Sequence, residues 1–145
     1  HNRSEKPVPY TYYGDLVEMA RDADILISVA PGGASTHHIV NAEVLKALGP
    51  DGLLVNVGRG SVVDEAALVA ALSSGTLGAA ALDVFEHEPK IPDALKAMDN
   101  VVLLPHVGSA TVETRAAMGD LVVDNLIAML ETGKARTPVP ECRDI

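Results

Sequence analysis

Arg59, Glu88 and His106 are three side chains that could share one acid–base reaction, and each closely follows a short apolar segment. An imidazole donates or accepts a proton near neutral pH, and a carboxylate beside it stabilises the protonated ring and selects which nitrogen faces a substrate. The planar guanidinium of arginine matches a carboxylate with two hydrogen bonds and can polarise an adjacent carbonyl oxygen. Together these residue types predict acid–base chemistry on a small anionic carbonyl compound.

Four apolar runs alternate with segments of helical spacing, which is typical of a parallel α/β sheet. The runs span residues 25–30, 53–57, 79–84 and 101–104, and the helical patterns span 14–22, 41–48, 65–74, 91–98 and 111–132. Right-handed crossovers between parallel strands bring the loops that follow the strands to one edge, where such sheets bind ligands. We therefore expect Arg59, Glu88 and His106 to meet there, and the strand before Arg59 to be buried on both faces.

Composition limits the possible partners. The chain has 145 residues, of which 48% are hydrophobic and 3% aromatic, so its core must be built from aliphatic side chains. A net charge of −9 argues against binding to nucleic acid or to an anionic membrane, because no basic stripe is present to neutralise phosphates. The single cysteine, Cys142, excludes an internal disulfide, and no apolar segment has the length of a membrane span or signal sequence. We expect a cytoplasmic protein.

The histidines raise the alternative of a metal site. His87, Glu88 and His106 could supply ligands, but no pair of them has the helical spacing that would support this interpretation. We therefore predict no metal. His37 and His38 are expected to cap or flank a helix in solvent.

Three linked motifs carry a family resemblance. NVGRGSVVDEAALVAAL, GAAALDVFEHEP and LLPHVGSAT resemble, in this order, the second half of the nucleotide-binding domain in the D-2-hydroxyacid dehydrogenase family, and among its members they are most similar to glyoxylate and hydroxypyruvate reductases. The resemblance implies a Rossmann-like parallel sheet and a homodimer. It also implies that Arg59 binds the substrate carboxylate and carbonyl, that His106 is the acid–base residue and that Glu88 is its partner.

A nicotinamide cofactor follows from the same resemblance, since none of the three side chains can transfer a hydride. The resemblance implies that the cofactor contacts are Pro31 near the adenine, Val57 and Gly58 at the nicotinamide, Asp83 at its carboxamide, and His106 and Gly108. Members that prefer NAD resemble one another in having an acidic residue at the end of the second strand, where this chain reads HNRS. Arg3 and Ser4 can bind a 2′-phosphate that an acid would repel. We predict NADP, with NAD still possible.

The resemblance also predicts how the domain is divided. The glycine-rich phosphate loop and the substrate domain of the family are absent from these 145 residues. We expect residues 1–137 to be the C-terminal part of the nucleotide-binding domain, with a long final helix at about 111–132. We expect residues 138–145 to be an extended tail leading towards a substrate domain. The isolated chain should then be inactive.

The predicted function is reduction of a small 2-oxo acid, such as glyoxylate or hydroxypyruvate, with hydride from NADPH. A dehydrogenase-like corepressor that uses the cofactor only as a ligand is the alternative from another class. The order Arg, Glu, His speaks against a third possibility, a relative of adenosyl-homocysteine hydrolase.

Overall fold

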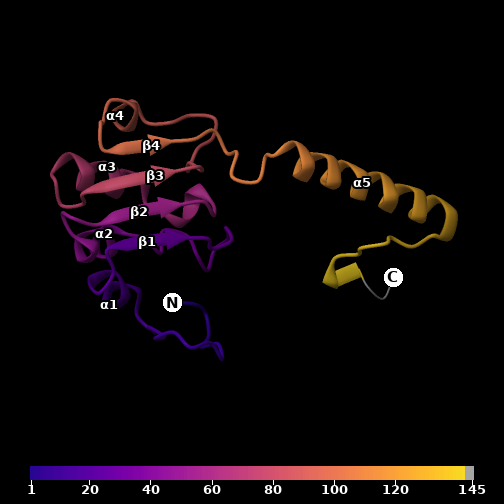
Figure 1. The fold of residues 1–145 in the computed structure, drawn as a ribbon, viewed down its shortest axis with the longest axis horizontal. Helices are drawn as coiled ribbons and strands as arrows, with labels where there is room; N and C mark the ends of the chain where they lie inside the picture. Colours follow the sequence, from indigo (N-terminus) through magenta and orange to yellow (C-terminus); the bar gives the residue numbers. More distant parts are fainter. Residues whose placement is uncertain (143–145) are drawn as a thin grey trace. The chain divides into compact units, whose positions relative to one another are not determined.

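A computed structural model describes residues 1–142, which form two compact units, one of residues 1–106 and one that begins at Val107. The first unit contains a four-stranded sheet in which all neighbours are parallel and the order is β1-β2-β3-β4 (Figure 1). The strands are β1 (Ile25–Ser28), β2 (Leu53–Asn56), β3 (Ala79–Leu82) and β4 (Val101–Leu103). Each lies within a predicted apolar run, so the parallel α/β fold is confirmed.

Four helices belong to this unit, and all but the last begin at a capping side chain. They are α1 (Leu16–Arg21), α2 (Ala42–Leu48), α3 (Glu65–Ser73) and α4 (Asp93–Lys96), with a 3₁₀ turn, η1 (Gly60–Val62), before α3. The side chains of Asp15, Asn41 and Asp64 accept hydrogen bonds from backbone N–H groups in the first turns of α1, α2 and α3, which these turns cannot satisfy internally. The caps therefore set where α1, α2 and α3 start.

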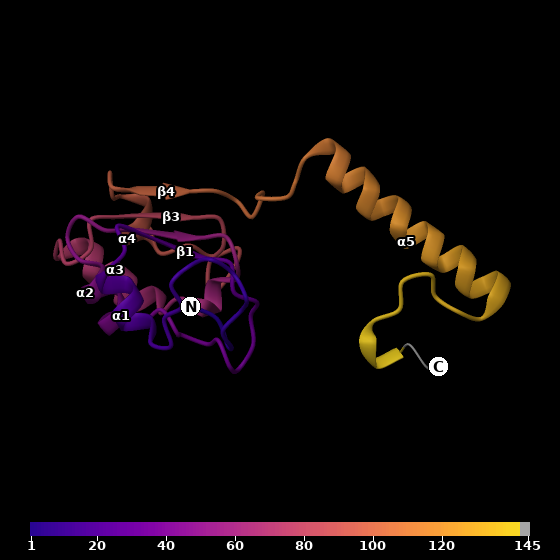
Figure 2. The same ribbon diagram turned by 60° about the horizontal axis from the view of Figure 1, so that its bottom comes forward.

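The sheet is covered on one face in this unit, so the prediction of a strand buried on both faces is wrong. Figure 2 shows α1, α2 and α3 together on one side of the sheet. In β2, Leu54 is fully buried towards them, whereas Leu53 and Val55 on the opposite face are only partly buried. In the neighbouring strand β1, Ile25 and Ile27 are 53% and 59% exposed. Consecutive strands laid down in one direction with right-handed crossovers place every crossover helix on the same face. A second covered face needs a reversal of strand order, which does not occur among the four strands of residues 1–106.

The second unit is built around α5 (Val112–Thr132), which Thr111 caps and Gly133 ends in the left-handed conformation, as predicted. Asn125 holds the following chain, because its amide donates to Thr137 Oγ1 at 2.9 Å. The tail differs from the extended form that we expected: Pro140–Cys142 form a 3₁₀ turn, η2, since the fixed φ of proline suits a first helical position. Residues 143–145 of that tail lie outside the described residues. Within residues 1–142, no helix combines the length and the apolar character that crossing a bilayer requires.

Candidate active site

Asn56, at the end of β2, shapes the loop that carries Arg59. Its side chain is buried; the amide donates to the carbonyl oxygen of Arg59 at 3.0 Å and the amide oxygen accepts from the N–H of Gly58 at 3.2 Å. A buried amide left without these partners would cost free energy, so the loop conformation and the side chain stabilise each other. The backbone at Arg59 is thus held by a residue inside the sheet.

Two glycines bring neighbouring loops into backbone contact. A Cβ at Gly58 would lie 2.5 Å from the carbonyl oxygen of Ala30, and one at Gly60 would collide with the carbonyl carbon of Phe85. Only a residue without a side chain allows such an approach. The loops that follow β1, β2 and β3 are therefore packed against one another at the carboxyl edge.

His106 and Glu88 form a hydrogen-bonded pair at this edge. His106 Nδ1 lies 2.9 Å from Glu88 Oε2, while Glu88 Oε1 accepts from the N–H of Phe85 at 2.9 Å. The hydrogen bond from His106 and then that from Phe85 hold the pKa of Glu88 below its ordinary value, and the nearby charge of Arg59 acts in the same direction. His106 has a φ of 57°, a conformation that few residues other than glycine adopt. With Nδ1 engaged by Glu88, Nε2 is the nitrogen left to face a ligand.

A cavity of about 790 Å³ brings the three predicted catalytic residues together: Arg59, Glu88 and His106 all line it. Three of the predicted cofactor residues, Pro31, Val57 and Gly58, line it as well. Arg59 is exposed, and its Nη1 donates to the carbonyl oxygen of Gly58 at 2.8 Å. The pocket therefore offers a cation, a carboxylate and an imidazole to one small molecule.

A second cavity of about 660 Å³ is lined by Arg3 and Ser4, the residues predicted to bind a 2′-phosphate. Residues 29–31 line both cavities, so the two adjoin along the loop after β1. Ser28 also lines the second cavity, and its buried Oγ has no hydrogen-bond partner among residues 1–142. An unpaired buried hydroxyl is costly unless a ligand or water reaches it, so this wall fits a polar ligand.

Two predicted cofactor residues are not in either cavity wall. Asp83 is 4% exposed and lines neither of the two cavities. Gly108 belongs to the second unit. The contacts that the resemblance implies for these two residues remain predictions.

His38 corrects a further expectation. We expected it to lie in solvent, but its ring is partly buried and its Nε2 lies 2.7 Å from Glu86 Oε1. Sequence reasoning also missed the structural role of Asn56 and the unpaired hydroxyl of Ser28. A polar residue inside an apolar run was the available signal for Asn56 and Ser28. No local pattern links His38 to Glu86, because 48 positions separate them.

Fold and pockets together define a Rossmann-like nucleotide-binding domain with an acid–base site at the carboxyl edge of its sheet. The chain belongs to the D-isomer specific 2-hydroxyacid dehydrogenase family, whose NAD-binding-domain model matches residues 1–108. This match confirms the predicted family, fold and cofactor class.

Relatives of known activity agree with this assignment. The chain is 56% identical over 139 residues to a hydroxyphenylpyruvate reductase of Plectranthus scutellarioides, which covers 95% of this chain and 44% of the relative. It is 53% identical over 140 residues to a glyoxylate/hydroxypyruvate reductase of Arabidopsis thaliana, covering 96% of this chain and 45% of the relative. The chain thus spans less than half the length of these relatives.

A solved structure of similar fold is the NADPH-dependent glyoxylate/hydroxypyruvate reductase of Sinorhizobium meliloti in complex with NADP and malonate. It aligns with a TM-score of 0.92 at 59% identity, over 97% of this chain and 44% of that one. Since these relatives are all reductases, they do not favour the corepressor alternative.

Proposed function

We propose that the protein containing this chain reduces a small 2-oxo acid to the 2-hydroxy acid with NADPH, and that glyoxylate and hydroxypyruvate are its preferred substrates. The observation that carries the proposal is the His106–Glu88 pair in a pocket that Arg59 also lines. The kinship with glyoxylate/hydroxypyruvate reductases supports the substrate class.

Each of the three residues contributes to the reaction in this proposal. Arg59 binds the substrate carboxylate and draws electron density from the adjacent carbonyl oxygen. His106 donates a proton to that oxygen, and Glu88 orients the ring and stabilises its charged form. Val57 and Gly58 would hold the nicotinamide, which when bound would supply the hydride. One hydride and one proton together convert the carbonyl to an alcohol.

The two adjoining cavities support the assignment of the cofactor. Val57, Gly58 and Pro31 line the cavity that also holds His106, whereas Arg3 and Ser4 line the other, so a ligand that extends past residues 29–31 reaches both groups. Arg3 offers a guanidinium and Ser4 a hydroxyl, which are suitable donors for a 2′-phosphate. We assign Asp83 and Gly108 to the cofactor from the resemblance alone.

Domain boundaries and assembly belong to the same proposal. We propose that residues 1–137 are the C-terminal part of the nucleotide-binding domain and that the intact protein is a cytoplasmic homodimer. No residue of α5 is buried, and Leu126 and Leu130 on it are exposed, so this helix offers apolar surface to a partner. The unpaired, exposed Cys142 is consistent with a reducing compartment.

The proposal is tested by following NADPH oxidation when glyoxylate or hydroxypyruvate is added to the intact protein. Arg59→Lys keeps the charge but loses the planar fork, and it should lower kcat/KM by about 10²-fold or more. Arg21→Lys, at an exposed position in α1 that lines neither cavity, is the matched control and should leave kcat/KM unchanged. The proposal would be contradicted if neither glyoxylate nor hydroxypyruvate were reduced, or if Arg59→Lys had a normal kcat/KM.

A further inference from the structure

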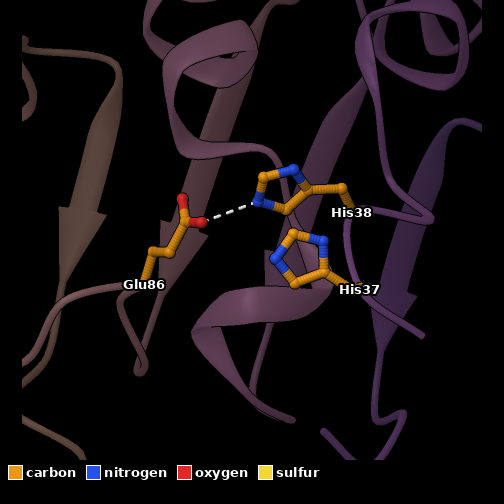
Figure 3. A group of neighbouring side chains, drawn as sticks. All are labelled: His37, His38 and Glu86. Carbon is orange, nitrogen blue, oxygen red and sulfur yellow. Dashed lines mark hydrogen bonds and ion pairs between the residues drawn. The ribbon is translucent and has the colours of Figure 1, made fainter. Parts of the chain in front are cut away.

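A second group of potential ligands lies beside the candidate active site. His37 and His38 follow β1, Glu86 follows β3, and Figure 3 shows both imidazole rings and the carboxylate gathered between these two segments. His38 Nε2 lies 2.7 Å from Glu86 Oε1, and the His37 and His38 rings stack with their centroids 3.8 Å apart. One potential ligand atom from each of the three residues lies within 4.8 Å of the other two.

The backbone holds the two rings on the same side. Successive side chains of an extended segment point in opposite directions, so stacked neighbours require another conformation. His38 supplies it with a φ of 52°, in the left-handed region, while its N–H donates to the carbonyl oxygen of Ser61 at 2.9 Å. An uncommon conformation that the surrounding structure holds in place is a reason to look for a function.

Glu86 is held from its own side of the cluster. Its backbone N–H donates to Glu65 Oε2 at 3.3 Å. Glu88, two residues further along the same loop, accepts a hydrogen bond from the N–H of Phe85. Glu86 and His38 are both partly buried, whereas His37 is exposed on one side and stacks on His38 with the other. Two ligands are thus preorganised, and the third can adjust.

Two imidazoles and one carboxylate suit a divalent transition-metal ion, and Zn²⁺ in particular takes this ligand set with water at the fourth position. Tetrahedral bonds of about 2.0–2.2 Å place neighbouring ligand atoms about 3.4 Å apart. The ligand atoms already lie within 4.8 Å of one another, so their positions need to shift by only about 1 Å. An imidazole binds a metal in its own plane, so the His37 ring must also rotate out of its stack on His38 for both rings to face one ion. The contact between His38 and Glu86 would open slightly, and His37 would move inwards.

We propose that His37, His38 and Glu86 form a binding site for one divalent transition-metal ion of the Zn²⁺ type. The site joins segments 48 positions apart, and Glu86 also lines the 790 Å³ cavity. The bound ion replaces the hydrogen bond between the loops that follow β1 and β3 with metal–ligand bonds. It binds the native arrangement and so raises the melting temperature. The proposal does not depend on the reductase activity.

Isothermal titration calorimetry of the intact protein with Zn²⁺ tests this directly, with the melting temperature as a second measurement. His37→Ala removes an exposed ring, and Glu86→Gln keeps the shape of the carboxylate while removing its charge. Each variant should weaken Zn²⁺ binding at this site by at least about tenfold and reduce the rise in melting temperature. Unfolding in the absence of metal checks that both variants remain folded.

Two matched controls locate the ion. His87→Ala removes another exposed histidine next to Glu86, and His106→Ala removes the imidazole of the candidate active site. Both should bind Zn²⁺ as tightly as the parent protein, in contrast to the weakened binding of His37→Ala. Absence of Zn²⁺ binding, or binding that His106→Ala abolishes and His37→Ala does not, overturns the proposal.

Discussion

At the scale of single residues, the pair of His106 and Glu88 explains how a partly exposed imidazole keeps one orientation. Glu88 is itself oriented, because one carboxylate oxygen accepts from Phe85 and the other faces His106. A side chain that hydrogen bonds already hold in one orientation loses less conformational entropy when a ligand binds. The candidate acid–base group therefore relies on a residue that would not itself contact the reacting carbonyl.

The lowered pKa of Glu88 predicts a pH dependence of stability. Folding favours the charged carboxylate, so its contribution to the free energy of unfolding is present above the ordinary pKa of 4.5 and is lost as the pH falls through the lowered value. Glu88→Gln should therefore be less stable than the parent protein at neutral pH, and the difference should shrink as the pH falls below the ordinary pKa of 4.5 and through the lowered pKa. Urea unfolding across this range measures it. A difference that stays constant down to the acid end would contradict the role given to the charge.

At the scale of elements, the site depends on loops that touch through their backbones. Gly60 lies at the start of η1, where it meets the carbonyl group of Phe85 from the loop that carries Glu88. The strands bring these loops to one edge, but the missing side chain lets them approach. A small side chain introduced at position 60 should therefore displace the loop that carries Glu88 without altering the sheet.

Gly60→Ala should destabilise the protein by about 1–3 kcal/mol, because its Cβ has no space, and it should also lower kcat/KM by displacing the Glu88 loop. Gly119→Ala is the matched control: Gly119 lies inside α5 with nothing within 4 Å of an added Cβ, so alanine should stabilise the helix by about 0.5–1 kcal/mol. Thermal unfolding and steady-state kinetics of both variants check this. A Gly60→Ala variant as stable and as active as the parent would refute the packing argument.

At the scale of the whole molecule, the first unit places the groups suited to catalysis and those suited to phosphate binding in two different cavities. The cavity at Arg59 and His106 holds the groups suited to chemistry, and the adjoining cavity at Arg3 and Ser4 holds groups suited to a phosphate. Both cavities are lined by the loop after β1, so one extended ligand can use both. Cofactor choice and catalysis should then respond to different mutations.

Arg3→Ala should reduce the preference for NADPH over NADH by at least about tenfold, which corresponds to 1.4 kcal/mol, because one charge-assisted contact to the 2′-phosphate is lost. The loss should appear in the KM for NADPH rather than in kcat, since Arg3 lies in the cavity away from the acid–base pair. Steady-state kinetics with both cofactors measures the ratio, and Arg21→Ala is the control. An unchanged ratio would remove Arg3 from the cofactor site.

The sequence by itself determined the elements and the edge at which the site forms. Asn41, Asp64 and Thr111 cap helices where the pattern indicates, because capping depends on groups two or three residues away. The apolar runs predicted parallel strands, and parallel strands bring Arg59 and His106 to one edge. These are consequences of short-range geometry and chain direction.

Only the tertiary structure decided which loops touch and which faces are covered. The pairing of His38 with Glu86 and the collision that reserves position 60 for glycine both depend on segments far apart in the chain. The exposed face of β1 follows from a strand order that apolar runs alone do not specify. An apolar run indicates that a strand can be buried, whereas whether it is buried depends on how many helices cover each face of the sheet.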